Sequence, residues 1–268
     1  MKTIVITGST RGFGYELAKK FLLRDCNVVI NGRNQKTVDS TCLQLKSETK
    51  QSNISGFACN VQDKNELSQL WEFATNHFHK VDVWINNAGI NQPDQYLWDL
   101  RQQAVEQIID IDLKGTIYGS QVAMNGMAEQ GFGFIYNVEG HGSNDSFISK
   151  LSLYGTAKRA VTYFTQALAK EAAEMGSGVK VGRISPGIMI TDFLRKPLGG
   201  GDKEIQLDEH VKKVYNILGD YPDRIAAFVV ERILGREQKN GEQIIWLTKW
   251  RAAFRFACAV FRKRKIVK

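Results

Sequence analysis

A glycine-rich turn that joins an apolar run to an amphipathic segment constrains the fold of this chain more than any other feature. Residues 4–6 read Ile-Val-Ile, and residues 7–14 read Thr-Gly-Ser-Thr-Arg-Gly-Phe-Gly. Gly8 permits a tight turn, Gly12 lets the backbone approach a pyrophosphate, and Gly14 lets a helix pack closely on a strand. A lone glycine-rich turn is often only a turn, but the order of strand, turn and helix predicts a helix N-terminus that binds nucleotide phosphates.

Short apolar runs alternate with longer segments of helical period along the chain. The expected strands are residues 4–7, 27–30, 54–59, 81–86, 134–138, 179–185 and 242–247, with helices between them that include a long helical stretch around residues 99–130. This alternation predicts an α/β fold with a doubly wound, mostly parallel, seven-stranded sheet of the Rossmann type. Because 268 residues are an ordinary length for such a fold, we expect a single domain over residues 1–247.

Composition argues against several other classes of protein. The chain is 43% hydrophobic and 24% charged, and it has no run of about 18 or more apolar residues that could cross a membrane. The four cysteines form no Cys-x-x-Cys pair and no metal-ligand spacing with the four histidines, so we expect reduced thiols and no metal site. The first strand begins almost at Met1, which predicts a cytosolic protein without a signal peptide.

Positive charge is concentrated at the C-terminus. Between residues 247 and 268 there are eight Lys or Arg and no Asp or Glu, so the remaining 28 basic residues balance the 28 acidic ones. This distribution argues against a nucleic-acid partner. Apolar residues at positions 250, 253, 254, 257, 258 and 261 predict a basic amphipathic helix over residues 248–268. Such a helix could contact a membrane surface peripherally, or pack on its own domain or on a sister subunit, and the sequence leaves these alternatives open.

Two arginines indicate which dinucleotide the chain prefers. An acidic residue after the second strand would bind the ribose 2′-hydroxyl of NAD, but residues 31–34 read Asn-Gly-Arg-Asn. Arg33, together with Arg11 in the glycine-rich turn, offers guanidinium donors to a 2′-phosphate. Two solvated surface arginines are the alternative. We therefore predict NADPH/NADP⁺ as the cofactor in preference to NADH.

Four motifs occur in the order that is typical of one enzyme family. They are the glycine-rich turn at residues 7–14, Asn86-Asn87-Ala88-Gly89, Tyr154-x-x-x-Lys158 and Pro186-Gly187-x-x-x-Thr191. With these motifs the chain resembles the short-chain dehydrogenase/reductase family over roughly residues 2–195 and the last strand. Together with the preceding analysis, the resemblance implies a cofactor site formed by Gly8, Thr10, Arg11, Gly12, Phe13, Gly14, Arg33, Asn60, Val61, Asn87, Ala88, Gly89, Tyr154, Lys158, Pro186, Gly187, Ile188 and Thr191.

The resemblance also implies which part of the cofactor each segment contacts. Asn60 and Val61 would contact adenine, residues 87–89 would line the ribose, and Ile188 and Thr191 would hold the nicotinamide carboxamide. The family usually has Asp where this chain has Asn60, whose amide still offers both hydrogen-bond roles. The segment 186–208 carries three consecutive glycines and is expected to form a substrate loop or lid.

The catalytic pair predicted by the resemblance is Tyr154 and Lys158. These residues are four apart, so they share one face of a helix. A phenol has a free pKa of about 10, so proton transfer near neutral pH requires a nearby cation such as Lys158. Tyr154 would then donate a proton to a carbonyl oxygen as hydride arrives from the cofactor. A core tyrosine beside a lysine with its ammonium group at the surface is the alternative for the pair alone.

A hydroxyl that steadies the carbonyl oxygen completes the family's site. In most members it lies thirteen residues before the tyrosine, but here that offset falls on His141. The stretch 137–143, Asn-Val-Glu-Gly-His-Gly-Ser, resembles the chlorophyll(ide) b reductase branch and makes Ser143 the catalytic candidate, ahead of Ser146 and Ser149. A partly exposed loop histidine is the preferred interpretation of His141, although contact with substrate or a proton-relay role is an alternative.

Two carboxylates near this site carry further expectations. Glu139 ends a buried strand and is expected to brace the loop or Lys158 rather than to take part directly in catalysis. Asp112 falls where the family has an asparagine whose backbone supports a water chain to the lysine. We include Asp112 among the catalytic residues, because that role can rest on a backbone carbonyl.

The leading functional prediction is an NADPH-dependent oxidoreductase that transfers hydride to an aldehyde or ketone of an apolar substrate. The branch resemblance adds a formyl tetrapyrrole as a candidate substrate. A general short-chain reductase of ketone, steroid or acyl substrates is the alternative. A non-catalytic dinucleotide-binding scaffold at a membrane is a third interpretation, which the intact Tyr154/Lys158 pair disfavours. We expect a homodimer or homotetramer with a cytoplasmic location, and membrane association through the C-terminal helix remains an option.

Overall fold

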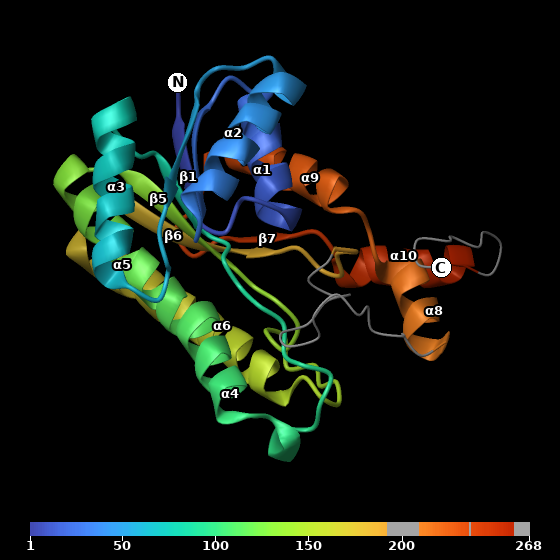
Figure 1. The fold of residues 1–268 in the computed structure, drawn as a ribbon. Helices are drawn as coiled ribbons and strands as arrows, with labels where there is room; N and C mark the ends of the chain where they lie inside the picture. The colour runs from blue at the N-terminus through green and yellow to red at the C-terminus, as the bar shows by residue number, and fades with distance from the viewer. Residues whose placement is uncertain (192–208, 236, 260–268) are drawn as a thin grey trace.

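The computed structural model describes residues 1–191, 209–235 and 237–259 (Figure 1). The strands are β1 (Thr3–Ile6), β2 (Asn27–Gly32), β3 (Ile54–Ala58), β4 (Val83–Asn86), β5 (Gly133–Val138), β6 (Val179–Ser185) and β7 (Gln243–Ile245). The helices are α1 (Gly12–Leu22), α2 (Gln35–Thr49), α3 (Lys64–Phe78), α4 (Gln102–Ile108), α5 (Gly115–Gln130), α6 (Ser152–Met175), α8 (Glu209–Leu218), α9 (Pro222–Leu234) and α10 (Lys249–Ala259). All seven expected strands are present, with ends that differ by a few residues.

The strands form one parallel seven-stranded sheet in the order β3-β2-β1-β4-β5-β6-β7. The chain runs from β1 outward to β3 and then returns to the other side of β1 with β4. This reversal opens a crevice at the carboxyl ends of β1 and β4, which is where open α/β sheets bind their ligands. The prediction of a doubly wound Rossmann-type sheet is confirmed.

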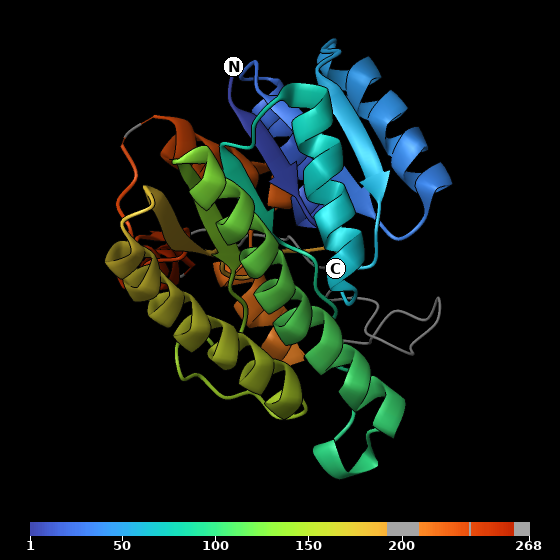
Figure 2. The ribbon, with the colours of Figure 1, turned by 90° about the vertical axis from the view of Figure 1, so that its left-hand side faces the viewer.

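Helices cover both faces of the sheet because alternate residues of each strand point to opposite sides. Ile4, Ile6, Val28 and Ile30 face α1, α2 and α9 in one apolar layer, whereas Val5 and its equivalents in neighbouring strands face α3, α5 and α6 in the other. Figure 1 shows α1, α2 and α9 together on one side, and Figure 2 views the face covered by α3, α5 and α6. Both layers pack around one sheet.

The expected helical stretch around residues 99–130 is divided into several pieces. A 3₁₀ helix covers Leu97–Asp99, α4 ends at Ile108, a π-helical segment covers Ile109–Lys114, and α5 follows. A π-helical turn carries one extra residue, which rotates the side chains that follow and is frequent at functional sites. This rotation could not be foreseen from the regular helical period of the sequence.

A chain of buried polar side chains crosses the centre of the sheet. Asn86 Nδ2 donates to Asn137 Oδ1 at 2.8 Å and to Ser120 Oγ at 3.0 Å, and Asn137 Nδ2 donates to Thr165 Oγ1 at 2.9 Å. Asn86 and Asn137 are direct partners in the register of β4 and β5. Because these amides are fully withdrawn from water, each needs its partners to offset the loss of hydration.

The two C-terminal expectations fall partly outside the described residues. Residues 192–208 of the expected lid and residues 260–268 of the expected C-terminal helix lie outside them. The described part of that helix is α10, which directly follows β7 and lies beside α8 (Figure 1). Within the described ranges, no helix combines the length and the apolar character needed to cross a bilayer.

Candidate active site

A cavity of about 930 Å³ lies at the carboxyl ends of the central strands. Its wall brings together segments that are far apart in the sequence: the turn after β1, the ends of β2 and β3, the segment after β4, and α6. Fifteen of the predicted site residues line it, namely Gly8, Thr10, Arg11, Gly12, Phe13, Gly14, Arg33, Asn60, Val61, Asn87, Ala88, Gly89, Tyr154, Lys158 and Thr191. The cavity therefore joins the glycine-rich turn to the Tyr154/Lys158 pair.

Close packing explains two of the glycines in the turn. Gly8 has a φ of +60°, and a methyl group on it would lie 2.7 Å from the Ala88 Cα. A methyl group on Gly14 would lie 2.5 Å from Asn87 Nδ2, which donates to the Gly8 carbonyl at 3.0 Å. The turn after β1 and the segment after β4 thus form one rigid wall, in which a larger side chain would have to displace backbone.

The N-terminus of α1 has the features of an anion site. Its N-cap residue is Arg11, whose side chain makes no capping hydrogen bond, in contrast to Asn34 and Asp63, which cap α2 and α3. Gly12 has a φ of +61°, and the space beside its Cα is open. Free backbone N–H groups and the positive end of the helix dipole fit a pyrophosphate at this end of the cavity.

Asn31 organises the same end of the cavity, and sequence reasoning did not single it out. Its Oδ1 accepts from the Gly8 N–H at 3.2 Å, and its Nδ2 donates to the Cys59 carbonyl at 3.1 Å. Arg11 and Arg33 both line the cavity beside it. A polar residue directly after the second expected strand was the available signal. Two arginines therefore line the same end of the cavity as the glycine-rich turn.

Tyr154, Lys158 and Asp112 form a buried cluster at the other end. Lys158 Nζ lies 3.2 Å from Asp112 Oδ2 and 5.7 Å from the centroid of the Tyr154 ring. The Lys158 side chain is 6% exposed and that of Asp112 is 0% exposed. Asp112 Oδ1 also accepts the Ile90 N–H at 2.8 Å. Asp112 thus contacts Lys158 through its carboxylate, whereas the sequence pointed only to its backbone carbonyl.

The surroundings of Tyr154 favour the protonated phenol by raising its pKa. Burial is the main cause that raises the Tyr154 pKa, and the negative charge of Asp112 raises it further. Burial also raises the pKa of the Asp112 carboxyl, although Lys158 and the Ile90 N–H partly offset this effect. A protonated phenol beside a cavity can donate a proton to a ligand oxygen. Removing that proton requires additional positive charge.

The π-helical segment places Asp112 in this cluster. Ile111 and Asp112 of this segment are buried next to the site. The Asp112 carbonyl accepts the Thr116 hydroxyl at 2.8 Å. In the same segment the half-buried Asp110 pairs with Lys114 at 2.7 Å. Two acidic residues two positions apart therefore have different surroundings, one buried at the site and one at the surface.

The loop after β5 packs directly on Tyr154. A methyl group on Gly140 would lie 2.2 Å from Tyr154 Oη, so only glycine fits there without a shift. Ser143 Oγ accepts the Gly140 N–H at 3.2 Å and donates to the Lys158 carbonyl at 3.2 Å. The predicted third catalytic group therefore lies between the loop and α6, and its hydroxyl contacts backbone groups of Gly140 and Lys158.

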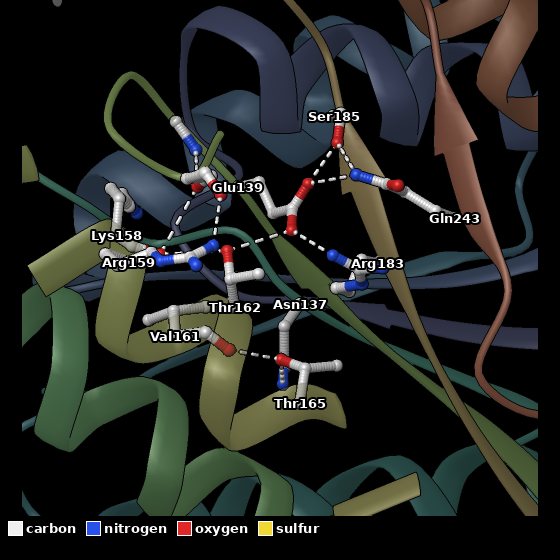
Figure 3. Close-up of polar contacts among 12 residues, drawn as sticks. Asn137, Glu139, Lys158, Arg159, Val161, Thr162, Thr165, Arg183, Ser185 and Gln243 are labelled. Carbon is white, nitrogen blue, oxygen red and sulfur yellow. Dashed lines mark hydrogen bonds and ion pairs between the residues drawn. The ribbon is translucent and has the colours of Figure 1, made fainter. Parts of the chain in front are cut away.

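Glu139 braces the loop through side chains from three elements, as Figure 3 shows. Its carboxylate accepts from Thr162 Oγ1 of α6 at 3.0 Å, from Arg183 Nη1 of β6 at 3.0 Å and from Gln243 Nε2 of β7 at 2.8 Å. Ser185 Oγ is a further donor. These contacts support the expected bracing role, with the brace directed to α6, β6 and β7 rather than to the Lys158 ammonium group.

Gln92 fixes the start of α6, a role that sequence reasoning missed. Its Oε1 accepts the backbone N–H groups of Leu153 at 3.0 Å and Tyr154 at 3.2 Å, in place of a side-chain cap from Leu151. A cap of this kind stabilises a helix by about 1 kcal/mol. Its position shortly after the Asn-Asn-Ala-Gly motif was the only available signal.

Five of the predicted site residues lie outside the lining of the cavity, and two of them, Ser143 and Asp112, are described above. Pro186, Gly187 and Ile188 do not form its wall, although the following Met189, Ile190 and Thr191 do. Among described residues His141 Nε2 is buried without a hydrogen-bond partner, and burial lowers the His141 pKa. Within the described residues, no group of three His, Cys, Asp or Glu side chains is placed to hold a metal ion.

Comparison with known proteins identifies similar sequences and folds. The model of the short chain dehydrogenase family matches residues 2–198. A probable chlorophyll(ide) b reductase NYC1, chloroplastic, of Arabidopsis thaliana is 31% identical over 248 residues, which are 87% of this chain and 48% of that protein. A chlorophyll(ide) b reductase NOL, chloroplastic, of Oryza sativa subsp. japonica is 33% identical over 234 residues, 86% of this chain and 66% of that protein. The chain thus spans about half to two thirds of the length of these relatives.

The fold is also found in a solved enzyme structure. A 3-ketoacyl-(acyl-carrier-protein) reductase from Brucella melitensis, complexed with NADH, superimposes with a TM-score of 0.78. The match covers 91% of this chain and 96% of that one at 21% sequence identity, so it supports the fold alone.

Proposed function

The chain belongs to the short-chain dehydrogenase family and is an NAD(P)-dependent oxidoreductase, and from this premise we propose that it reduces an aldehyde or ketone of an apolar substrate with NADPH. One observation carries the proposal. A single cavity joins the uncapped N-terminus of α1 to the buried Tyr154/Lys158 pair. A dinucleotide bound along it has phosphate donors at one end and a proton donor at the other.

The proton chemistry of the site suits reduction. When bound, the nicotinamide supplies the hydride. Tyr154 donates the proton to the carbonyl oxygen, because burial and the Asp112 charge keep its phenol protonated at neutral pH. Lys158 stabilises the phenolate that remains, and Asp112 limits that stabilisation because its carboxylate lies 3.2 Å from the same ammonium group.

We assign Ser143 to the hydroxyl that steadies the substrate oxygen. Its support is proximity to the catalytic pair: Ser143 Oγ accepts the Gly140 N–H and donates to the Lys158 carbonyl, and Gly140 packs on Tyr154 Oη. Ser143 does not line the cavity, so its hydroxyl has to turn away from the Lys158 carbonyl to donate to a substrate oxygen. Ser146 provides a matched control, because its hydroxyl bonds only within the exposed turn, to Asn144. Ser143→Ala is expected to lower turnover strongly, and Ser146→Ala to leave it unchanged.

The preference for NADPH rests on Arg11 and Arg33. Both line the cavity, and residues 31–34 at the end of β2, where an acid would bind a 2′-hydroxyl, read Asn-Gly-Arg-Asn. A 2′-phosphate would form charge-assisted hydrogen bonds with these guanidinium groups. NADH would leave them without that partner.

The proposed substrate class is taken from the names of similar proteins. Two of them are named as chlorophyll(ide) b reductases, so we propose a formyl group on a tetrapyrrole as the leading substrate class. A ketone, steroid or acyl substrate is the alternative within the same chemistry, and a non-catalytic dinucleotide-binding scaffold is the alternative outside it. A cytoplasmic homodimer or homotetramer completes the proposal.

Measurements of cofactor binding and then of turnover test the proposed function. NADPH and NADH would be titrated by fluorescence into the wild-type chain and Arg33→Ala, and NADPH oxidation would then be followed with chlorophyllide b and with panels of aldehydes, ketones and steroids. We expect tighter NADPH binding that Arg33→Ala weakens, and turnover that Tyr154→Phe abolishes. Binding without Tyr154-dependent turnover across the panel would favour the scaffold.

A further inference from the structure

The C-terminal helix α10 packs on the domain with its arginines. Arg255 donates to the Leu218 carbonyl at 2.7 Å and forms an ion pair with the buried Asp220. One turn earlier, Arg251 donates to the Trp246 carbonyl and lies over the Trp246 ring, 4.1 Å from its centroid. The side of the helix that carries these two arginines is therefore held against the protein.

The apolar side of α10 consequently faces solvent. Trp250 is 87% exposed and Phe254 is 69% exposed, and Ala253 and Ala257 are exposed as well. Their spacing places them on one stripe of the helix. This orientation is the reverse of a helix that covers its own domain. An exposed aromatic stripe of this kind indicates a surface that another partner covers.

Charge selects between the two partners that could cover this stripe. The segment from residue 247 to residue 268 carries eight Lys or Arg and no acidic residue, and four of the cations, residues 262–265, follow the stripe directly in sequence. A symmetric contact with a second copy would bring two such basic segments together, which is unfavourable. An anionic lipid surface accepts the aromatic side chains among its headgroups and attracts the cations.

We propose that α10 is a lipid-docking helix, with Trp250 and Phe254 inserted into the interface of an anionic membrane. The inference goes beyond the proposed reductase activity and does not depend on it. Membrane docking also concerns the site, because Asp220 connects α10 to the cavity. The Asp220 N–H donates to the Ile188 carbonyl at 3.0 Å, and the Ile190 N–H donates to the Asp220 carbonyl at 3.1 Å.

Helix α10 and the segment 188–191 are therefore linked through Asp220. Because Ile190 and Thr191 line the cavity, lipid contact through α10 would bring this end of the cavity close to the bilayer. An apolar substrate dissolved in the membrane would then have a short path to the site.

Vesicle co-sedimentation of the full chain tests the proposal. Phosphatidylcholine vesicles with and without phosphatidylserine would be compared at low and high salt for the wild type, for Trp250→Ser/Phe254→Ser and for Trp98→Ser. Trp98, 79% exposed on the 3₁₀ helix Leu97–Asp99, is the matched control. We expect the wild type and Trp98→Ser to bind anionic vesicles in a salt-sensitive manner, and the double variant to bind about tenfold or more weakly.

Circular dichroism and thermal melting would establish that each variant folds. Wild-type protein that stays in solution with anionic vesicles would overturn the proposal, as would a double variant that binds as tightly as the wild type. A double variant with unchanged vesicle binding and a smaller molecular mass by light scattering would assign the stripe to a subunit contact instead. Loss of vesicle binding with retained NADPH turnover on a water-soluble aldehyde would support docking separately from the proposed activity.

Discussion

Replacing Asp112 by Asn removes one negative charge from the buried cluster while changing its shape little. The Asn side-chain oxygen can still accept the Ile90 N–H, which now donates to Asp112 Oδ1 at 2.8 Å. The ion pair with Lys158 is lost, and with it the charge that opposes ionisation of Tyr154. The substitution therefore isolates the effect of Asp112 on the proton donor.

The size of the effect follows from the distances in the cluster. Lys158 Nζ lies 5.7 Å from the Tyr154 ring centroid. At an effective dielectric constant of about 20, two unit charges at this distance interact by about 3 kcal/mol, which corresponds to about two pKa units. Asp112, 3.2 Å from the same Nζ, cancels part of this attraction. We expect Asp112→Asn to lower the Tyr154 pKa by about one to two units.

The pH dependence of turnover in both directions provides the assay. Reduction requires the phenol, so its rate falls as pH rises through the Tyr154 pKa; alcohol oxidation requires the phenolate, so its rate rises through the same pKa. In Asp112→Asn both limbs should move to lower pH, and oxidation should gain relative to reduction near neutral pH. Steady-state kcat measured with NADPH and with NADP⁺ between weakly acidic and strongly alkaline pH would show this.

Asp110→Asn is the matched control, because Asp110 lies in the same π-helical segment but pairs with Lys114 at the surface. Its profiles should coincide with those of the wild type. Profiles of Asp112→Asn that stay in place or move to higher pH would refute the electrostatic reasoning. A thermal melt would confirm that the variant folds despite the loss of a buried ion pair.

Two further substitutions test the loop after β5. Gly140→Ala would place a methyl group 2.2 Å from Tyr154 Oη and should lower kcat by about 100-fold or more, whereas Gly155→Ala, whose new methyl group meets only an ordinary 3.7 Å contact, should not. Glu139→Ala leaves the part-buried Arg183 without its carboxylate and should lower the free energy of unfolding by about 3–5 kcal/mol in chemical denaturation. Glu237→Ala, which removes an exposed partner of Lys180, should leave the unfolding midpoint unchanged, and an equal loss in both variants would contradict the brace.

The sheet was predictable because its evidence is local. Most strands are short runs rich in β-branched or aromatic residues, and the glycine-rich turn specifies the strand, turn and helix that start the fold. Fifteen site residues were also predictable, since motifs that follow parallel strands meet at one edge of the sheet. In both cases, the positions of residues along the sequence are enough to predict which residues lie close together in the fold.

Side-chain partners that come from distant elements were not predictable in this way. The Lys158–Asp112 ion pair depends on a π-helical turn, and the Gln92 cap on α6 joins residues about 60 positions apart. The orientation of α10 on the domain could not be predicted from the sequence either. Its periodic stripe was visible in the sequence, but the arginine contacts that turn this stripe toward solvent involve Asp220, which lies between α8 and α9. Periodicity defines a face without specifying what that face meets.

The hydrogen-bonded amides of Asn86 and Asn137 give the centre of the sheet a single alignment. If β5 slipped by one residue along β4, apolar strand neighbours would still find apolar neighbours, but both amides would lose their partners in the dry interior. The same slip would move the loop that carries Gly140 away from Tyr154. Two buried polar side chains thus make a misaligned sheet energetically unfavourable, and the same alignment is the one that assembles the site.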